Sequence, residues 1–140
     1  MQKIYNAQGV KARQREDNED RSLVYRDWIR TVNTGGLFID IDFVKWKNNK
    51  DGKLMPVAIT DITRCDKENI EESYRDAILE RLFQRDKQGE LLETLGNLLR
   101  IPVYLVLFQK EMKWLWVYSF RKNYWREFTP NNWALYLKGL

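Results

Sequence analysis

Three aspartates, Asp40, Asp42 and Asp61, stand out because each interrupts a segment that otherwise reads as a hydrophobic strand. Asp40 and Asp42 are two residues apart and share one face of their strand, and Asp61 follows Asp42 by 19 residues on the strand expected to pair with it. Ionised carboxylates beside a core cost free energy unless a cation or a Lys or Arg side chain compensates them. Mg²⁺ prefers one or two carboxylates completed by water and substrate phosphate, so the pattern predicts a site for Mg²⁺ or Mn²⁺.

A second interpretation of these carboxylates involves no metal. Asp40 and Asp42 would then lie on the solvent face of a two-sided hairpin, with Lys45 and Lys47 balancing their charge. The strand pattern fits both interpretations equally well.

The residue counts exclude several classes of enzyme. The 140 residues contain no histidine and one cysteine, Cys65, which removes Ser-His-Asp and Cys-His hydrolases, histidine-dependent nucleases and zinc deaminases. Hydrolysis would have to rely on carboxylates and a hard metal ion, helped by Lys, Arg, Thr or Tyr.

Length and composition indicate one globular domain, because 44% apolar and 14% aromatic residues are enough to fill one core. The net charge of +4 favours a polyanionic partner such as DNA only weakly. A single cysteine cannot form an internal disulfide, and no apolar run reaches the length of a signal peptide or of a membrane span. We therefore expect a cytoplasmic protein that does not cross a membrane.

The first 19 residues read as a mobile or loosely docked arm, followed by one domain over residues 20–140. The arm carries the basic residues Lys11, Arg13 and Arg15, which would contact DNA or, alternatively, remain solvated.

Hydrophobic periodicity, caps and turn residues predict the elements of the domain. They are a helix from Asp20 or Ser22 to about residue 32, a hairpin of strands at 37–47 and 54–64, a bent helical region over 70–99, strands at 101–108 and 114–120, and a last helix opened by Thr129 and Pro130.

The strand WLWVYSF places Trp114, Trp116 and Tyr118 on one face. Such a row of rings is one way to stack on single-stranded nucleic acid. The alternative, which we favour, is that the rings pack beneath the last helix.

The order of these elements resembles the PD-(D/E)XK nuclease superfamily, which has the restriction-endonuclease-like fold. The stretches that look like its short phage and bacterial members are YRDWIR at 25–30, DIDF at 40–43 and VAITDITR at 57–64. The later LLRIPVYLVLF and TPNNWALYLKGL also look like that family's closing strand and helix. The resemblance covers about residues 22–140 and implies an α/β fold with a restriction-endonuclease-like core, a central mixed sheet of four to five strands flanked by helices.

The resemblance also implies metal ligands. Asp42 would be the first acid of the motif, Asp61 the second, and Asp40 an auxiliary ligand.

Thr63 departs from the family pattern, because it stands where the family has a lysine that orients or activates the attacking water. Lys67 or Arg75, on or just before the next helix, would then supply the missing positive charge. Otherwise Thr63 would only help to position a water that the metal activates.

We therefore expect a metal-dependent DNA endonuclease that hydrolyses phosphodiester bonds with carboxylate-bound Mg²⁺, and in which Lys45 and Lys47 contact DNA. The alternative is a catalytically inactive, nuclease-like module for nucleic-acid binding or assembly. A homodimer or higher homo-oligomer would present two such sites to the two strands of a duplex.

Overall fold

The computed structural model of the chain describes residues 19–140. Lys11, Arg13 and Arg15, the predicted DNA-contacting residues of the arm, lie outside the described residues. In chain order the elements are α1 (Glu19–Thr31), β1 (Phe43–Asn48), β2 (Leu54–Arg64), α2 (Glu72–Glu80), the π-helical turn η2 (Arg81–Arg85), α3 (Gln88–Leu99), β3 (Val103–Phe108), β4 (Leu115–Ser119), β5 (Tyr124–Phe128) and α4 (Pro130–Lys138).

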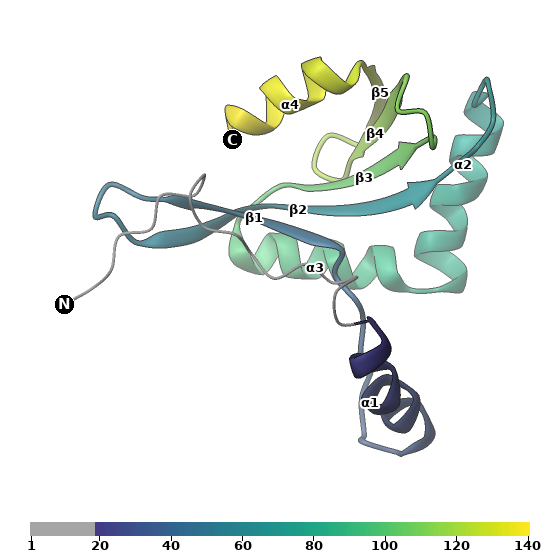
Figure 1. The fold of residues 1–140 in the computed structure, drawn as a ribbon, viewed down its shortest axis with the longest axis vertical. Coiled ribbons are helices and arrows are strands. Elements are labelled where there is room, and N and C mark those ends of the chain that lie inside the picture. The colour runs from purple at the N-terminus through teal and green to yellow at the C-terminus, as the bar shows by residue number, and fades with distance from the viewer. Residues whose placement is uncertain (1–18) are drawn as a thin grey trace.

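The five strands form one mixed sheet in the order β1-β2-β3-β4-β5. β2 and β3 run parallel, and all other neighbours run antiparallel. α2 and α3 connect β2 to β3 on one side of the sheet, α4 lies on the other side, and α1 stands apart at the end of an extended segment (Figure 1). The prediction of an α/β fold with a mixed sheet of four to five strands flanked by helices is confirmed. Within residues 19–140, no helix has the length and apolar character needed to span a bilayer.

The alternation of side chains along the strands divides the core into two clusters. Ile59 of β2 and Leu105 of β3 face α3 and pack with Leu92, which is fully buried. The intervening Ala58 and Val106 face α4 and pack around residues such as Trp133. The helices on each side therefore bury one face of the same sheet, as a sheet with a parallel strand pair requires.

α3 approaches β3 closely at Gly96. A Cβ at this position would lie 2.5 Å from Cγ2 of Val103 and 3.1 Å from the carbonyl oxygen of Ile101. Only glycine allows this spacing, which fixes the height of α3 above the sheet.

α4 begins as predicted, with Pro130 in its first turn and the Thr129 hydroxyl accepting a hydrogen bond of 3.2 Å from the Asn132 N–H. Its last turn is held from β1. The ammonium of Lys45 donates to the carbonyl oxygen of Leu137, and that of Lys47 donates to the carbonyl oxygen of Leu140 at 3.1 Å. The lysines thereby place positive charge at the negative end of the helix.

The prediction that the first strand starts at residue 37 is wrong, because β1 begins at Phe43. Ile39 and Ile41 do pack against the α3-side core, which explains their alternation. Residues 37–42 nevertheless form no strand. The alternation thus reflects one-sided burial of an extended segment rather than strand pairing.

The prediction that the rings of Trp114, Trp116 and Tyr118 pack beneath the last helix is also wrong. All three belong to the core cluster on the α2 and α3 side, and the ring centroid of Tyr118 lies 5.2 Å from that of Trp125. Trp125 belongs to β5, a strand that the sequence pattern did not predict separately. β5 alternates weakly because its exposed residues include Tyr124 beside charged neighbours.

Candidate functional site

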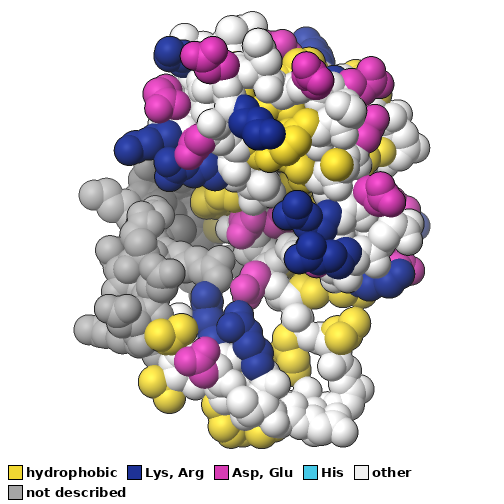
Figure 2. Space-filling model, turned by 90° about the vertical axis from the view of Figure 1, so that its right-hand side faces the viewer, with side chains coloured by type: hydrophobic (Ala, Val, Ile, Leu, Met, Phe, Trp, Pro, Cys, Tyr) yellow, Lys and Arg dark blue, Asp and Glu magenta, His cyan; other side chains and the backbone are white. Residues whose placement is uncertain are grey.

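Asp42 and Asp61 lie together in the wall of a cleft of about 460 Å³ on the α2 and α3 side of the sheet. Their carboxyl groups share a hydrogen bond. Asp40 and Thr63 also line the cleft. Viewed from the side on which α2 lies in Figure 1, acidic side chains occupy the middle of the molecule and Lys and Arg side chains flank them (Figure 2). The structure therefore brings together the two acids that the sequence analysis singled out.

Asp42 is positioned by the end of the β1–β2 ladder. The last paired residues are Phe43 and Thr60, and the next N–H that β2 presents toward β1, that of Ile62, donates to Oδ2 of Asp42 at 2.9 Å. The aspartate side chain thus takes the place of a backbone acceptor. Residue 42 therefore fits the alternating strand pattern of the sequence, although it lies just outside β1.

Asp61 is positioned by β2 itself and is only 5% exposed. Its carboxyl oxygens accept from the side-chain amide of Gln88 at 3.3 and 3.4 Å, and the same amide donates to the backbone carbonyl of Asp40 at 3.2 Å. Gln88 therefore links Asp61 of β2 to the extended segment that precedes β1. These neutral contacts compensate the buried carboxyl only partly.

The protonation of Asp61 is strongly perturbed. Burial is the largest cause, followed by the hydrogen bond and the negative charge of Asp42, and together they raise the pKa of Asp61 from its ordinary 3.8 to about 8. At neutral pH and without a cation, the pair therefore holds one proton. A cation between the two carboxyl groups would replace that proton.

Two arginines line the same cleft. Arg64, at the end of β2, is paired with Asp66 through a contact of 2.7 Å. Arg81 is the first residue of the π-helical turn, in which the N–H of Asp86 donates to the carbonyl of Arg81 at 3.0 Å. Such turns widen a helix by one residue and are frequent at functional sites.

The structure places the two predicted cations differently. The ammonium of Lys67 lies 4.0 Å from the ring centroid of Tyr74, a residue that lines the cleft, but Lys67 is not itself among the lining residues. The guanidinium of Arg75 lies 3.8 Å from the ring of Trp116 and donates to the carbonyl of Ile70 at 2.6 Å. Arg75 thus packs over β4 and is not among the residues that line the cleft.

Lys45 and Lys47, predicted to contact DNA, instead donate to the end of α4 as described above. Burial and then the charge of Lys47 lower the pKa of Lys45. Contact between these lysines and DNA stays a prediction.

Gln88, Arg81 and Tyr74 also line the cleft, although the sequence pattern did not predict them as site residues. Tyr74, Ile78 and Arg81 follow one another at helical spacing, so an arginine continuing an otherwise apolar stripe was the available signal for Arg81. Gln88 had none, because its position depends on the bend at Lys87, which adopts a left-handed conformation with φ of 59°.

The donor set suits Mg²⁺, which binds through one or two carboxylates and keeps several waters. Asp42 and Asp61 would hold the ion, and Asp40 lines the same cleft. Across residues 19–140, no three or more carboxylate or cysteine side chains come together as a complete metal-binding group. The remaining ligands would therefore be water and substrate.

Comparison with known proteins identifies no relative of the chain. No family model, curated protein or solved structure matches the chain. The residues and the geometry of the cleft are therefore the basis for inferring a function.

The raised pKa of Asp61 predicts an unusual dependence of stability on pH. The folded-state pKa of about 8 lies above the unfolded value of 3.8. The favourable contribution of Asp61 to the free energy of unfolding is therefore fully present below pH 3.8 and is lost as the pH rises through about 8. In EDTA, the difference in unfolding free energy between Asp61→Asn and the wild type should move in favour of the variant by at most about 1.4 kcal/mol per pH unit over that range. Urea unfolding at several pH values measures this difference.

Glu111→Gln, at an exposed turn, is the control and should track the wild type at every pH. A difference between Asp61→Asn and the wild type that stays constant with pH would show that Asp61 has the same pKa in the folded and unfolded protein, which would contradict the prediction.

Proposed function

We propose that the protein is a metal-dependent DNA endonuclease whose site consists of Asp42, Asp61 and the surrounding cleft. The observation that carries the proposal is the contact between two carboxyl groups, one of them buried with a pKa near 8, in a cleft that two arginines also line. Perturbed carboxyl pairs in clefts are typical of functional sites. Two carboxyl groups with a purely structural role would gain no stability from lying so close together.

The residues of the cleft would have distinct roles. Asp42 and Asp61 would hold a divalent cation, with Gln88 orienting Asp61 and the Ile62 N–H orienting Asp42. Bound Mg²⁺ would supply Lewis-acid stabilisation of the phosphate and lower the pKa of water. Thr63 lines the cleft two residues after Asp61, where its hydroxyl would hydrogen-bond the attacking water.

The positive charge that the motif lysine supplies in the family would come from Arg81 rather than Arg75. Arg81 lines the cleft, whereas Arg75 is engaged with Trp116. A guanidinium binds two phosphate oxygens at once, so Arg81 would hold the scissile phosphate and stabilise its developing charge. Lys67, which contacts Tyr74 and does not line the cleft, would act at longer range. The unpaired Cys65 suits the cytoplasm, where DNA substrates are available.

Substitutions of the two acids test the chemistry. Asp42→Asn and Asp61→Asn each keep an oxygen for the neighbouring donor but remove a charge, so both should lower Mg²⁺-dependent cleavage of plasmid or single-stranded DNA at least about 100-fold while the protein stays folded. The measurement is a gel assay with Mg²⁺, Mn²⁺ or EDTA, with Glu111→Gln as the control. Wild-type cleavage that persists in EDTA, or variants that cleave normally, would sink the proposal.

Substitution of Arg81 tests the origin of the positive charge. Arg81→Gln should lower the single-turnover cleavage rate about 100- to 1,000-fold, as loss of one transition-state donor does elsewhere, while DNA affinity changes little. Arg85→Gln is a matched control, because Arg85 belongs to the same π-helical turn, is exposed and does not line the cleft. Lys67→Ala should have a smaller effect than Arg81→Gln. Wild-type cleavage rates for both Arg81→Gln and Arg85→Gln would show that no cation from this turn takes part.

A second candidate function, nucleic-acid binding without cleavage, is favoured by a basic cleft at the other end of the sheet. This cleft of about 430 Å³ is lined by Arg100, which ends α3, and by Arg121 and Lys122 of the β4–β5 turn. No Asp or Glu side chain is among its lining residues, and Tyr136 and Ser119 contribute hydroxyl groups. Cations from two elements around tyrosine rings suit a nucleic-acid backbone.

Salt dependence tests the basic cleft. Arg121→Gln and Lys122→Gln should each weaken DNA binding and reduce the slope of log K against log salt by about 1, because each removes one phosphate contact. Fluorescence anisotropy with labelled DNA in EDTA measures both quantities, with Lys50→Gln in the β1–β2 turn as the control. Reduced binding by these variants together with a wild type that cleaves no DNA would favour the binding module. Unchanged slopes would exclude this cleft as a DNA site.

A further inference from the structure

The acidic cleft can enclose a phosphate group that enters it, but cannot act on one that lies across its mouth. Asp61 is only 5% exposed, so a metal ion held by its carboxyl group would lie below the surface of the molecule. The cleft has a volume of about 460 Å³. Pockets of roughly 300–1,000 Å³ enclose one small molecule, which is also the size of a single nucleotide. The cleft therefore offers space for one nucleotide rather than for a base pair with both of its backbones.

The lining of the cleft suits both parts of a nucleotide. Tyr74, Ile78 and Leu82 recur every four residues along the helical run and give the cleft an apolar side. Arg81 and the aspartates give it a charged side. A base has apolar faces that contact rings and aliphatic side chains, whereas its phosphate requires cations. An unpaired nucleotide would find a partner for each part.

Basic side chains lie on both sides of the acids. Figure 2 shows them above and below the acidic side chains, and the lower ones lie over α1. Within α1, Ser22, Arg26 and Ile29 are half-buried, whereas the other described side chains of the helix are exposed. The stripe that contains Arg26 therefore faces the rest of the molecule, and Arg30 follows it four residues later. Across the acids, Arg81 lines the opposite side of the cleft.

α1 can change its distance from the cleft without disturbing the acids. Among the described residues, none from α1 belongs to either core cluster. The chain is anchored only later, where Ile39 and Ile41 pack against the core. Between α1 and this anchor lie Gly35, with φ of 77°, and Gly36, and a Cβ on either would meet nothing within 4 Å. A bend at these glycines moves α1 and leaves Asp42 in place.

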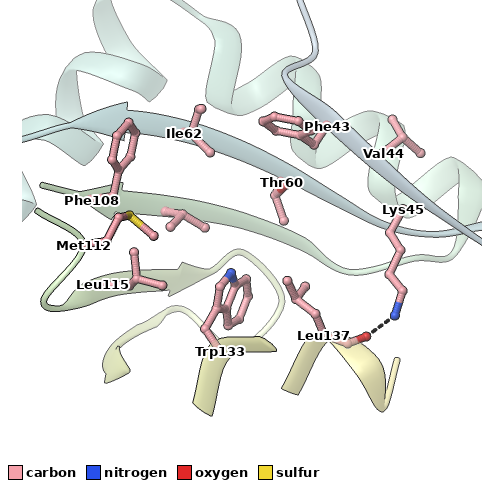
Figure 3. A pocket seen from close by; sticks show the side chains of 11 residues that line it. Phe43, Val44, Lys45, Thr60, Ile62, Phe108, Met112, Leu115, Trp133 and Leu137 are labelled. Atoms are coloured by element: carbon pink, nitrogen blue, oxygen red, sulfur yellow. Dashed lines mark hydrogen bonds between the residues drawn. The ribbon is translucent and has the colours of Figure 1, made fainter. Parts of the chain in front are cut away.

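The hollow on the opposite side of the sheet offers no comparable path for a nucleic-acid backbone. It has a volume of about 480 Å³ between the sheet and α4, and its apolar walls include Phe43, Ile62 and Trp133 (Figure 3). Among the described residues that line it, Lys45 is the one charged side chain, and its ammonium donates to the carbonyl oxygen of Leu137. Phosphates are therefore better accommodated on the side of the acidic cleft.

We propose that the substrate is a single strand of DNA that runs between α1 and the π-helical turn, with the nucleotide at the scissile bond inside the acidic cleft. Arg81 holds the scissile phosphate, and Arg26 and Arg30 hold phosphates of flanking nucleotides. A duplex does not fit this path, because it is stiff and would have to unpair and extrude a nucleotide first. This inference rests on the proposed function for the position of the scissile phosphate, and it adds the strandedness of the substrate.

Cleavage of one labelled oligonucleotide in three forms tests the strandedness. The oligonucleotide is presented to the full chain in Mg²⁺ as a single strand, as a blunt duplex and as a duplex with a single-stranded tail. Single-turnover cleavage of the single strand should be at least about 100-fold faster than cleavage of the blunt duplex, because the duplex must first unpair a nucleotide. The tailed duplex should be cut within its tail. Equal rates for single strand and blunt duplex would overturn the proposal.

Substitutions in α1 test the path of the strand. Arg26→Gln and Arg30→Gln should each reduce the slope of log K against log salt for single-stranded DNA by about 0.7, the value for one phosphate contact on a single strand. Fluorescence anisotropy in EDTA measures the slope, and circular dichroism checks that the variants stay folded. Lys50→Gln, at the exposed β1–β2 turn, is the control and should bind like the wild type. Unchanged slopes for both arginine variants would exclude α1 from the path.

The two readouts separate this inference from the proposed function. A wild type that cleaves no DNA would refute the nuclease. Tighter binding of single strand than of duplex in EDTA, weakened by Arg26→Gln and Arg30→Gln, would still support the path of the strand. Mg²⁺-dependent cleavage of duplex and single strand at equal rates would support the nuclease and overturn the inference. A wild type that neither cleaves DNA nor binds single strands more tightly than duplexes would overturn both.

Discussion

The parallel pairing of β2 with β3 is the constraint on which the rest of the structure depends. Two consecutive parallel strands cannot be joined by a tight turn, so the chain must travel the length of the sheet between them. It does so through α2, the π-helical turn and α3. This crossover covers one sheet face, and it also carries Arg81 and Gln88 past the end of β2, beside Asp61. The cleft is thus a consequence of the topology, not an addition to it.

Burial of Asp61 gives the cleft its chemical character. The carboxyl lies in a layer otherwise filled by residues such as Ile59 and Leu105, where ionisation has little support from solvent. The Gln88 amide is an uncharged donor, and the neighbouring ionisable group is the carboxyl of Asp42, which carries no positive charge. The electrostatic need for a positive charge is therefore built into the fold. A proton meets it in the metal-free protein, and the divalent cation proposed above would compete with that proton for the same place.

Much of the fold follows from local sequence, and the parts that do not have identifiable causes. Thr129 and Pro130 predicted the start of α4, and the two acids were recognisable because aspartate is rare in hydrophobic strands. The sequence favoured Arg75 over Arg81 as the arginine at the cleft, since both lie on the same helical run and the apolar stripe that ends at Arg81 was a weak signal. Trp116 attracts Arg75 away from the cleft, and the π-helical turn begins at Arg81. Both effects depend on tertiary contacts.

The two lysine contacts between β1 and the end of α4 carry a consequence for biosynthesis. They join residues 45 and 47 to residues 137 and 140, which are 92 and 93 residues apart in the sequence. Such contacts raise the contact order and cannot form until the last helix has left the ribosome. During translation, the α4-facing side of the β1–β2 hairpin therefore stays exposed until α4 has been synthesised. A nascent chain at this stage would depend on chaperones or on rapid completion to avoid aggregation.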